Sequence, residues 1–193
     1  MKSESIVFAV AGMCFGVILG WVIAVQQVPG PTAPETSAEP AGSPGSNRPA
    51  PVLDEARVQA LTTILKSDPQ NAKAAVQLAD TYFDGGRYDD AIIWYTQALS
   101  VDPRNVDAST DLGLSYYYVG QIARALRQFE ASLTIDPRHA KTLLNQGIVL
   151  AFGKQDLTAA SAAWQKAVEF APDSPEGQAA RRALEGVSSA GHP

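Results

Sequence analysis

The chain returns to the same residue types at one regular interval, and this period restricts the fold more than any other feature of the sequence. It is marked by Xaa-Pro pairs at Asp68-Pro69, Asp102-Pro103, Asp136-Pro137 and Ala171-Pro172. The spacings between successive prolines of these pairs are 34, 34 and 35. A period of this length, with helical hydrophobic patterning, is typical of stacked helix–turn–helix units. The sequence therefore predicts an all-α solenoid from residue 52 onward.

Each period also carries the same order of residue types: a small residue, a large side chain three residues later, then Ala with an aromatic four residues later. The three sets are Ala79 and Tyr82 with Ala91 and Tyr95, Gly113 and Tyr116 with Ala125 and Phe129, and Gly147 and Leu150 with Ala160 and Trp164. Small residues allow two helices to cross closely, and aromatic rings fill the space between neighbouring helices. We expect Gly85-Gly86, Gly120 and Gly153 to mark the turns between paired helices.

This pattern resembles the tetratricopeptide repeat (TPR) family over residues 52–187. The resemblance implies three repeats, at residues 70–104, 105–138 and 139–173. The third repeat holds one extra residue, which we expect in the turn at residues 152–156, because turns tolerate insertions best.

Both ends of the solenoid need capping helices, because a repeat cannot bury its apolar faces alone. An N-terminal cap is predicted at 52–69, with its helix over 52–66. Its inward side chains are expected to be Leu53, Val58, Leu61, Ile64 and Leu65. A C-terminal cap is predicted at 174–187, starting at Ser174-Pro175 and burying Ala179, Ala180, Ala183 and Leu184. Residues 188–193 are expected to form a disordered tail.

An uncharged run at residues 6–25 is long enough to cross a bilayer as a helix, at ~1.5 Å per residue. A cleaved signal peptide is the alternative, but the apolar core of such a peptide is shorter, about 7–15 residues. Gly12, Gly16 and Gly20 share one face of the expected helix, a pattern that supports self-association between membrane helices. The sequence predicts an uncleaved transmembrane anchor.

The orientation of this anchor follows from positive charge near its ends. Lys2 precedes the run, and no Lys or Arg follows it until Arg48. The positive-inside rule then places residues 1–5 in the cytoplasm and the repeats in the periplasm of a bacterium, as a single-pass inner-membrane protein. Residues 26–51 are expected to be a disordered linker, because the stretch from Pro29 to Pro51 holds seven Pro and lacks the apolar side chains of a core.

Composition and motifs argue against several classes of function. The net charge of −5 does not suit a nucleic-acid binder. The chain has one Cys, Cys14, and two His, His139 and His192. These exclude an intrachain disulfide, a Cys-rich zinc site and a multi-His metal site. No nucleophile elbow, phosphate-binding loop or zinc-protease motif occurs. We therefore expect a non-enzymatic protein without a metal or cofactor.

The resemblance implies that the working surface is the concave face, lined by the first helix of each repeat. The residues expected there are Val76, Phe83, Asp111, Leu114, Tyr117, Tyr118, Leu144, Asn145, Ile148 and Phe152. A surface rich in Phe, Tyr, Leu and Ile suits a peptide or a helix of another protein. Asp111 and Asn145 are expected to bond a peptide backbone. The alternative is that the C-terminal helix covers part of this surface.

Charge in the expected groove narrows the class of ligand. Some TPR domains bind a C-terminal carboxylate through a set of Lys, Arg and Asn, of which only Lys141 and Asn145 are matched here. The acidic side chains of Asp80, Asp84 and Asp107 instead favour a ligand with a basic end. The sequence therefore predicts against a carboxylate clamp.

The order of anchor, Pro-rich linker and three repeats resembles the bacterial membrane-anchored TPR proteins related to cytochrome c maturation factors. Thr110-Asp111-Leu112-Gly113 and residues 160–176 carry a further likeness to that group. The resemblance implies a periplasmic domain that binds apocytochrome. Alternatives are an assembly subunit for secretion, pilus or division machinery, a mitochondrial import receptor, and a non-catalytic subunit that tethers an enzyme.

Overall fold

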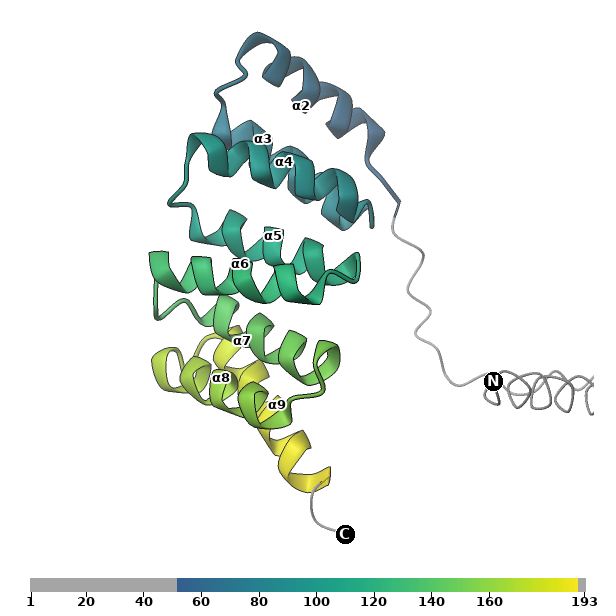
Figure 1. The fold of residues 1–193 in the computed structure, drawn as a ribbon. Coiled ribbons are helices and arrows are strands. Elements are labelled where there is room, and N and C mark those ends of the chain that lie inside the picture. Colours follow the sequence, from purple (N-terminus) through teal and green to yellow (C-terminus); the bar gives the residue numbers. More distant parts are fainter. Residues whose placement is uncertain (1–51, 191–193) are drawn as a thin grey trace, which may run out of the picture. The chain divides into compact units, whose positions relative to one another are not determined.

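The computed structural model describes residues 52–190, which form a column of helix pairs (Figure 1). The elements are α2 (Glu55–Ser67), α3 (Ala72–Asp84), α4 (Tyr88–Val101), α5 (Val106–Tyr118), α6 (Ile122–Ile135), α7 (Ala140–Ile148), η1 (Val149–Gly153), α8 (Leu157–Phe170) and α9 (Pro175–Ala190). Residues 52–190 contain no strand, so the predicted all-α solenoid is confirmed for this part of the chain. None of its helices is both long and apolar enough to cross a bilayer. The expected anchor at 6–25 and linker at 26–51 lie outside the described residues.

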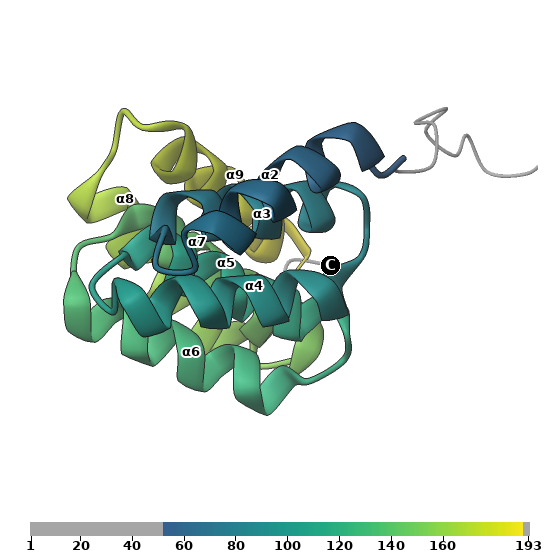
Figure 2. The same cartoon turned by 90° about the horizontal axis from the view of Figure 1, so that it is seen from above.

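Consecutive helices pack as antiparallel pairs, with α3 on α4, α5 on α6 and α7 on α8. The first helices α5 and α7 also contact each other, and α7 contacts the capping helix α9. Seen from above, α4 and α6 lie on the other side of the column from α3 (Figure 2). The side chains of Asn71, Asn105 and Asp156 each accept a hydrogen bond from the third N–H of the following helix, at 2.9–3.0 Å. Such caps satisfy N–H groups that the helix itself leaves unpaired.

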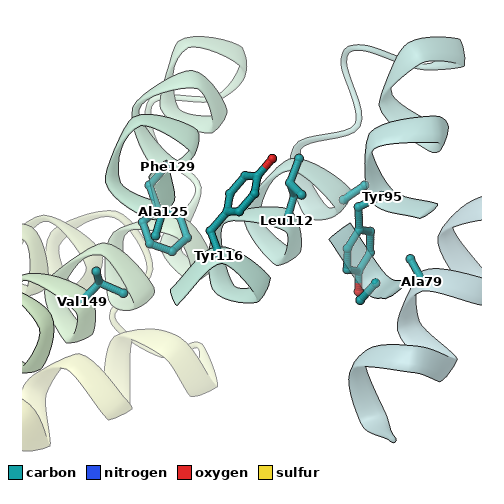
Figure 3. Packing of buried hydrophobic residues seen from close by; sticks show 9 residues of the cluster. Ala79, Tyr95, Leu112, Tyr116, Ala125, Phe129 and Val149 are labelled. Carbon is teal, nitrogen blue, oxygen red and sulfur yellow. The ribbon is translucent and has the colours of Figure 1, made fainter. Parts of the chain in front are cut away.

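Close helix crossings depend on the small residues that the sequence pattern marks. Ala79, Gly113, Gly147 and their partners Ala91, Ala125 and Ala160 are all buried. A Cβ atom on Gly113 would lie 2.6 Å from Cε1 of Phe129, and one on Gly147 would collide with the indole ring of Trp164. Figure 3 shows the large side chains of Tyr95, Leu112, Tyr116 and Phe129 between the helices. The predicted roles of small and aromatic residues are confirmed.

The core consists of three apolar clusters rather than one. The first joins the first two repeats and includes Val149 of the third, and the second joins α2 to α3 and α4. The third joins the third repeat to α9. Each repeat thus buries its apolar surface against its neighbours, as a solenoid requires.

The third repeat accommodates its extra residue earlier than expected. Its first helix widens into the π-helical turn η1, in which the N–H of Lys154 donates to the carbonyl of Val149 at 3.2 Å. A π-turn takes up one additional residue without breaking the helix. The left-handed backbone position of this turn is Gln155, with φ 57°, whereas Gly86 and Gly120 take that role in the first two repeats. The expectation that Gly153 marks the third turn was therefore wrong.

The two caps also differ in detail from the prediction. Residues 52–54 precede α2, and Ile64 is 43% exposed although it was expected inward. Ile64 lies one period before the buried Ala98, but within residues 52–190 no preceding helix covers α2 as α3 covers α4. At the other end, Ser174 caps α9 as predicted, its Oγ accepting from the N–H of Gly177 at 3.0 Å. The helix α9 runs to Ala190, so residues 188–190, expected in a disordered tail, are helical.

Candidate functional site

The candidate site is the surface formed by α3, α5 and α7, the first helices of the three repeats. Equivalent positions lie one period apart, so Asp80, Leu114 and Ile148 occupy the same place on successive helices. Asp84, Tyr118 and Phe152 form a second such row. The predicted groove residues therefore lie on neighbouring helices, and two pockets form among them.

We call the first of these the acidic pocket. It has a volume of about 500 Å³ and is lined by Arg57, Asp80, Phe83, Asp84, Tyr95, Asp111, Leu114 and Lys141. It brings together three of the residues predicted from the sequence, Phe83, Asp111 and Leu114. Three of its eight side chains are carboxylates and two are cations, so its net charge is negative.

Hydrogen bonds organise this pocket. Lys141 on α7 donates to Asp111 on α5 at 2.8 Å, and the hydroxyl of Tyr95 donates to Oδ1 of Asp80 at 2.7 Å. Burial raises the pKa of the Asp111 carboxyl, and the charge and hydrogen bond of Lys141 partly oppose that rise. Burial, followed by the hydrogen bond to Asp80, raises the pKa of Tyr95 and keeps it a donor. Asp111, which was expected to bond a peptide backbone, accepts a hydrogen bond from Lys141 in this structure.

We call the second one the apolar pocket. It has a volume of about 490 Å³ and is lined by Leu144, Ile148, Ala151, Phe152, Leu157, Trp164, Ala179, Ala183, Gly186 and Val187. Helix α9 presents small residues here, opposite the large side chains of Leu144, Ile148 and Phe152. The sequence left open whether the C-terminal helix covers the groove or leaves it exposed, and the structure shows partial cover. Leu144 and Ile148 are half-buried beside α9, while Phe152 remains 73% exposed.

The other predicted residues lie outside both pockets. Val76 and Tyr117 are half-buried and pack on the first apolar cluster. Tyr118 is 52% exposed and stacks on Tyr88, with ring centroids 4.5 Å apart. Asn145, which was expected to bond a peptide backbone, is only 8% exposed.

Several lining residues were missed by the sequence reasoning. Arg57 comes from α2 and lies one period before the small Ala91. A cation at a position where the later repeats have a small residue was the sequence feature that could have indicated its role. The small residues Ala179, Ala183 and Gly186 share one face of α9 at helical spacing, and α9 was considered only as a cover. Within residues 52–190, no group of three His, Cys, Asp or Glu side chains could hold a metal ion.

Replacing Lys141 by Met tests the ion pair that closes the acidic pocket. We expect the free energy of unfolding to fall by about 1–2 kcal/mol at pH 7, because Asp111 is left desolvated without its partner. Without Lys141 to oppose the effect of burial, the pKa of Asp111 rises further. The loss of unfolding free energy should therefore shrink as the pH falls toward 4, where the carboxyl accepts a proton. Urea unfolding at both pH values measures this. Arg87→Met breaks the exposed pair with Asp90 and should cost less than about 1 kcal/mol; equal losses from the two variants would contradict the account.

Comparisons with known proteins agree with this architecture. Residues 79–120 match a model described as TPR repeat, and residues 110–175 match a model described as Tetratricopeptide repeat. Among solved structures, MamA is 23% identical, with a TM-score of 0.59 over 68% of this chain and 77% of that one. The first TPR domain of Spaghetti (RPAP3), bound to the HSP90 peptide SRMEEVD, is 26% identical, with a TM-score of 0.56 over 64% and 94%. The Sgt2 TPR domain from Aspergillus fumigatus is 26% identical, with a TM-score of 0.56 over 62% and 78%.

No curated protein sequence matches the chain. The repeat matches together reach from residue 79 to residue 175, over the helix pairs described above. Paired helices at a regular period, stacked with small residues at each crossing, define an α-solenoid of the interaction-module class. The chain belongs to the tetratricopeptide repeat family.

Proposed function

We propose that this protein is an interaction scaffold or assembly factor that binds a segment of a partner protein in the groove of α3, α5 and α7. The observation that carries this proposal is a pair of pockets that share α7. The charged pocket reaches α3 and α5, and the apolar pocket lies between α7, η1, α8 and α9. A structural neighbour of 26% identity holds a peptide of another protein, which supports the same use of this fold. Neither pocket holds a set of residues suited to catalysis.

The partner of this protein differs in charge from that neighbour's peptide. The peptide SRMEEVD carries three acidic residues and one Arg, whereas the acidic pocket here is itself negative. Lys141 and Asn145, which resemble part of a carboxylate clamp, are respectively bonded to Asp111 and buried. A partner segment with positive charge therefore suits this groove better than an acidic C-terminus.

The proposal extends to location. We infer from the uncharged run at 6–25 and the flanking charges that the repeats are held on the periplasmic side of a bacterial inner membrane by an uncleaved anchor. The order of anchor, linker and repeats supports maturation of c-type cytochromes as the pathway. Assembly of another envelope complex is the second pathway that this architecture supports.

A reporter enzyme that is active only in the periplasm tests the location. Fused after His192, it should be active, and the mass of the membrane-bound protein should correspond to the whole chain. Adding an Arg-rich segment directly after Val25 should lower the activity, because positive charge then disfavours export of the repeats. A protein whose mature start lies near Val25 would contradict the anchor, and an inactive fusion would contradict the orientation.

Affinity capture from solubilised membranes tests the binding function. The variant carrying Asp84→Lys and Phe152→Glu changes both pockets at exposed positions and should lose at least 10-fold of the captured partner. The matched control carries Glu130→Lys and Ile93→Glu, which likewise replace an acid by Lys and a large apolar residue by Glu at exposed positions on α6 and α4. Capture of apocytochrome would establish the proposed pathway. Equal capture by the two variants would place the working surface elsewhere.

A further inference from the structure

The two pockets share helix α7. Lys141 of the acidic pocket and Leu144 of the apolar pocket lie one turn apart on α7. Leu114 and Ile148 occupy equivalent positions on the neighbouring helices α5 and α7 and belong to different pockets. A single bound segment that crosses from α5 toward α9 would therefore meet a charged surface first and an apolar one next.

The acidic pocket retains negative charge that the protein does not neutralise. Asp111 is paired with Lys141. Within residues 52–190, no Lys, Arg or His nitrogen lies within 4.0 Å of a carboxylate oxygen of Asp80 or Asp84. Arg57 also lines this pocket, so it offsets one of these two charges. Asp107, 3.9 Å from Lys141 and 3.4 Å from Nε2 of His139, adds a further carboxylate at the edge. The carboxylates of the pocket thus outnumber its cations, which favours a cationic side chain of a ligand.

The position of these carboxylates is unfavourable for the helix that carries them. Asp84 is the last residue of α3, and Asp80 lies one turn earlier. Negative charge near a helix C-terminus opposes the helix dipole, at a cost of roughly 0.3–1 kcal/mol for an exposed group. The charge of Asp84 therefore does not stabilise α3 through the helix dipole.

The apolar pocket has room for a large side chain because α9 contributes so little bulk. Ala179, Ala183 and Gly186 face it from one side of α9. A Cβ atom added to Gly186 would meet no atom within 4 Å, so space remains next to the helix backbone. Phe152 lies at the exposed edge of the pocket, where its ring can contact a bound side chain.

Together these features define the chemistry of the partner segment, given the proposed function. We infer that the groove recognises an extended segment that carries an Arg or Lys for the acidic pocket and a large apolar residue for the apolar pocket. Neighbouring packed helices lie about 8–10 Å apart, so the two pockets are separated by roughly 10–15 Å. An extended chain spans this with about four residues, at ~3.3 Å each.

A peptide panel tests this specificity. The probes are fluorescent 12-residue peptides of Ser and Gly, with both ends capped, that contain one Arg and one Leu separated by two to eight positions, in both orders. Binding to the full chain in lipid nanodiscs is measured by fluorescence anisotropy, with empty nanodiscs as the blank. We expect the tightest binding at a separation of about four. Replacing Arg by Glu, or Leu by Ser, should weaken it at least 10-fold.

Two variants with matched controls assign each anchor to its pocket. Gly186→Leu fills the apolar pocket and should remove the affinity that the peptide gains from its Leu. Gly186→Ala, the matched control, should retain most of that affinity. Asp84→Asn should reduce the preference for Arg over Glu at least fivefold, with an unchanged or higher melting temperature. Glu169→Gln, an exposed acid on α8, should not change that preference.

The outcomes separate this inference from the proposed function. Binding that depends on Arg alone, on Leu alone, or on a separation near eight, as in a helical segment, overturns the extended two-anchor segment. The same holds if no peptide of the panel binds. In each case the proposed function still stands if Asp84→Lys with Phe152→Glu abolishes partner capture. If that variant captures the partner normally, both fail.

Discussion

Gly113→Leu should be among the most damaging single substitutions in the repeats. Its Cβ would start 2.6 Å from Phe129, whose ring is fully buried, and a leucine adds three further carbons at the crossing of α5 and α6. Overpacking of this kind costs typically 1–3 kcal/mol, and we expect about 3 kcal/mol or more here because the ring has no free space. Urea unfolding followed by far-ultraviolet circular dichroism measures the loss.

The chain offers a control of the opposite sign. Gly186 is also a helical glycine, but a Cβ there meets nothing within 4 Å. Gly186→Ala should therefore raise the free energy of unfolding by about 0.5–1 kcal/mol, the usual gain from replacing Gly in an exposed helix. If both substitutions changed stability in the same direction, the assignment of Gly113 to a close helix crossing would be wrong.

Ending the chain at Pro172 should unfold the third repeat. Helix α9 contributes Ala180, Leu184 and Val187 to the cluster that covers Trp164. Fully burying a large apolar side chain stabilises by about 1.5–3 kcal/mol, so the partly buried Leu184 and Val187 with the newly exposed Trp164 should cost about 3–5 kcal/mol. A terminal repeat without its cap is not expected to survive this loss.

Hydrogen exchange measures the effect of this truncation helix by helix. Amides of α7 and α8 should lose their protection, while those of α3 to α6 keep it, because the first two clusters do not include α9. A chain that ends at Ser188 retains Leu184 and Val187 and should behave as the whole protein. Protected amides in α8 after truncation at Pro172 would show that α9 is no structural cap.

The sequence predicted the repeats well because each signature residue acts within its own helix pair. The small residues at 79, 113 and 147 and the rings at 95, 129 and 164 meet as expected. The pattern repeats along the chain, so three observations supported each role. The extra residue of the third repeat occurs once, and no pattern predicted that it would be taken up by a π-turn at Val149.

The groove was harder to predict, because its surface depends on which side chains meet between helices far apart in the sequence. The bond from Lys141 to Asp111 joins two residues 30 positions apart, and nothing in helical spacing indicates it. Tyr117 and Leu144 were expected to be free for a ligand, yet both are half-buried against apolar clusters. Their replacement by Ala would lower stability together with binding. Asp84 and Phe152, which are exposed, separate the two effects.

Site-specific photocrosslinking gives the most direct test of the claim that the partner binds in the groove of the first helices. A benzophenone amino acid is placed at Phe152, 73% exposed beside the apolar pocket, or at Ile93, 61% exposed on α4. Both positions can take a large apolar side chain without disturbing the core. After irradiation in cells, the account predicts one dominant crosslinked protein from position 152 and at least 10-fold less of it from position 93. Equal yields, or a stronger product from position 93, would contradict it.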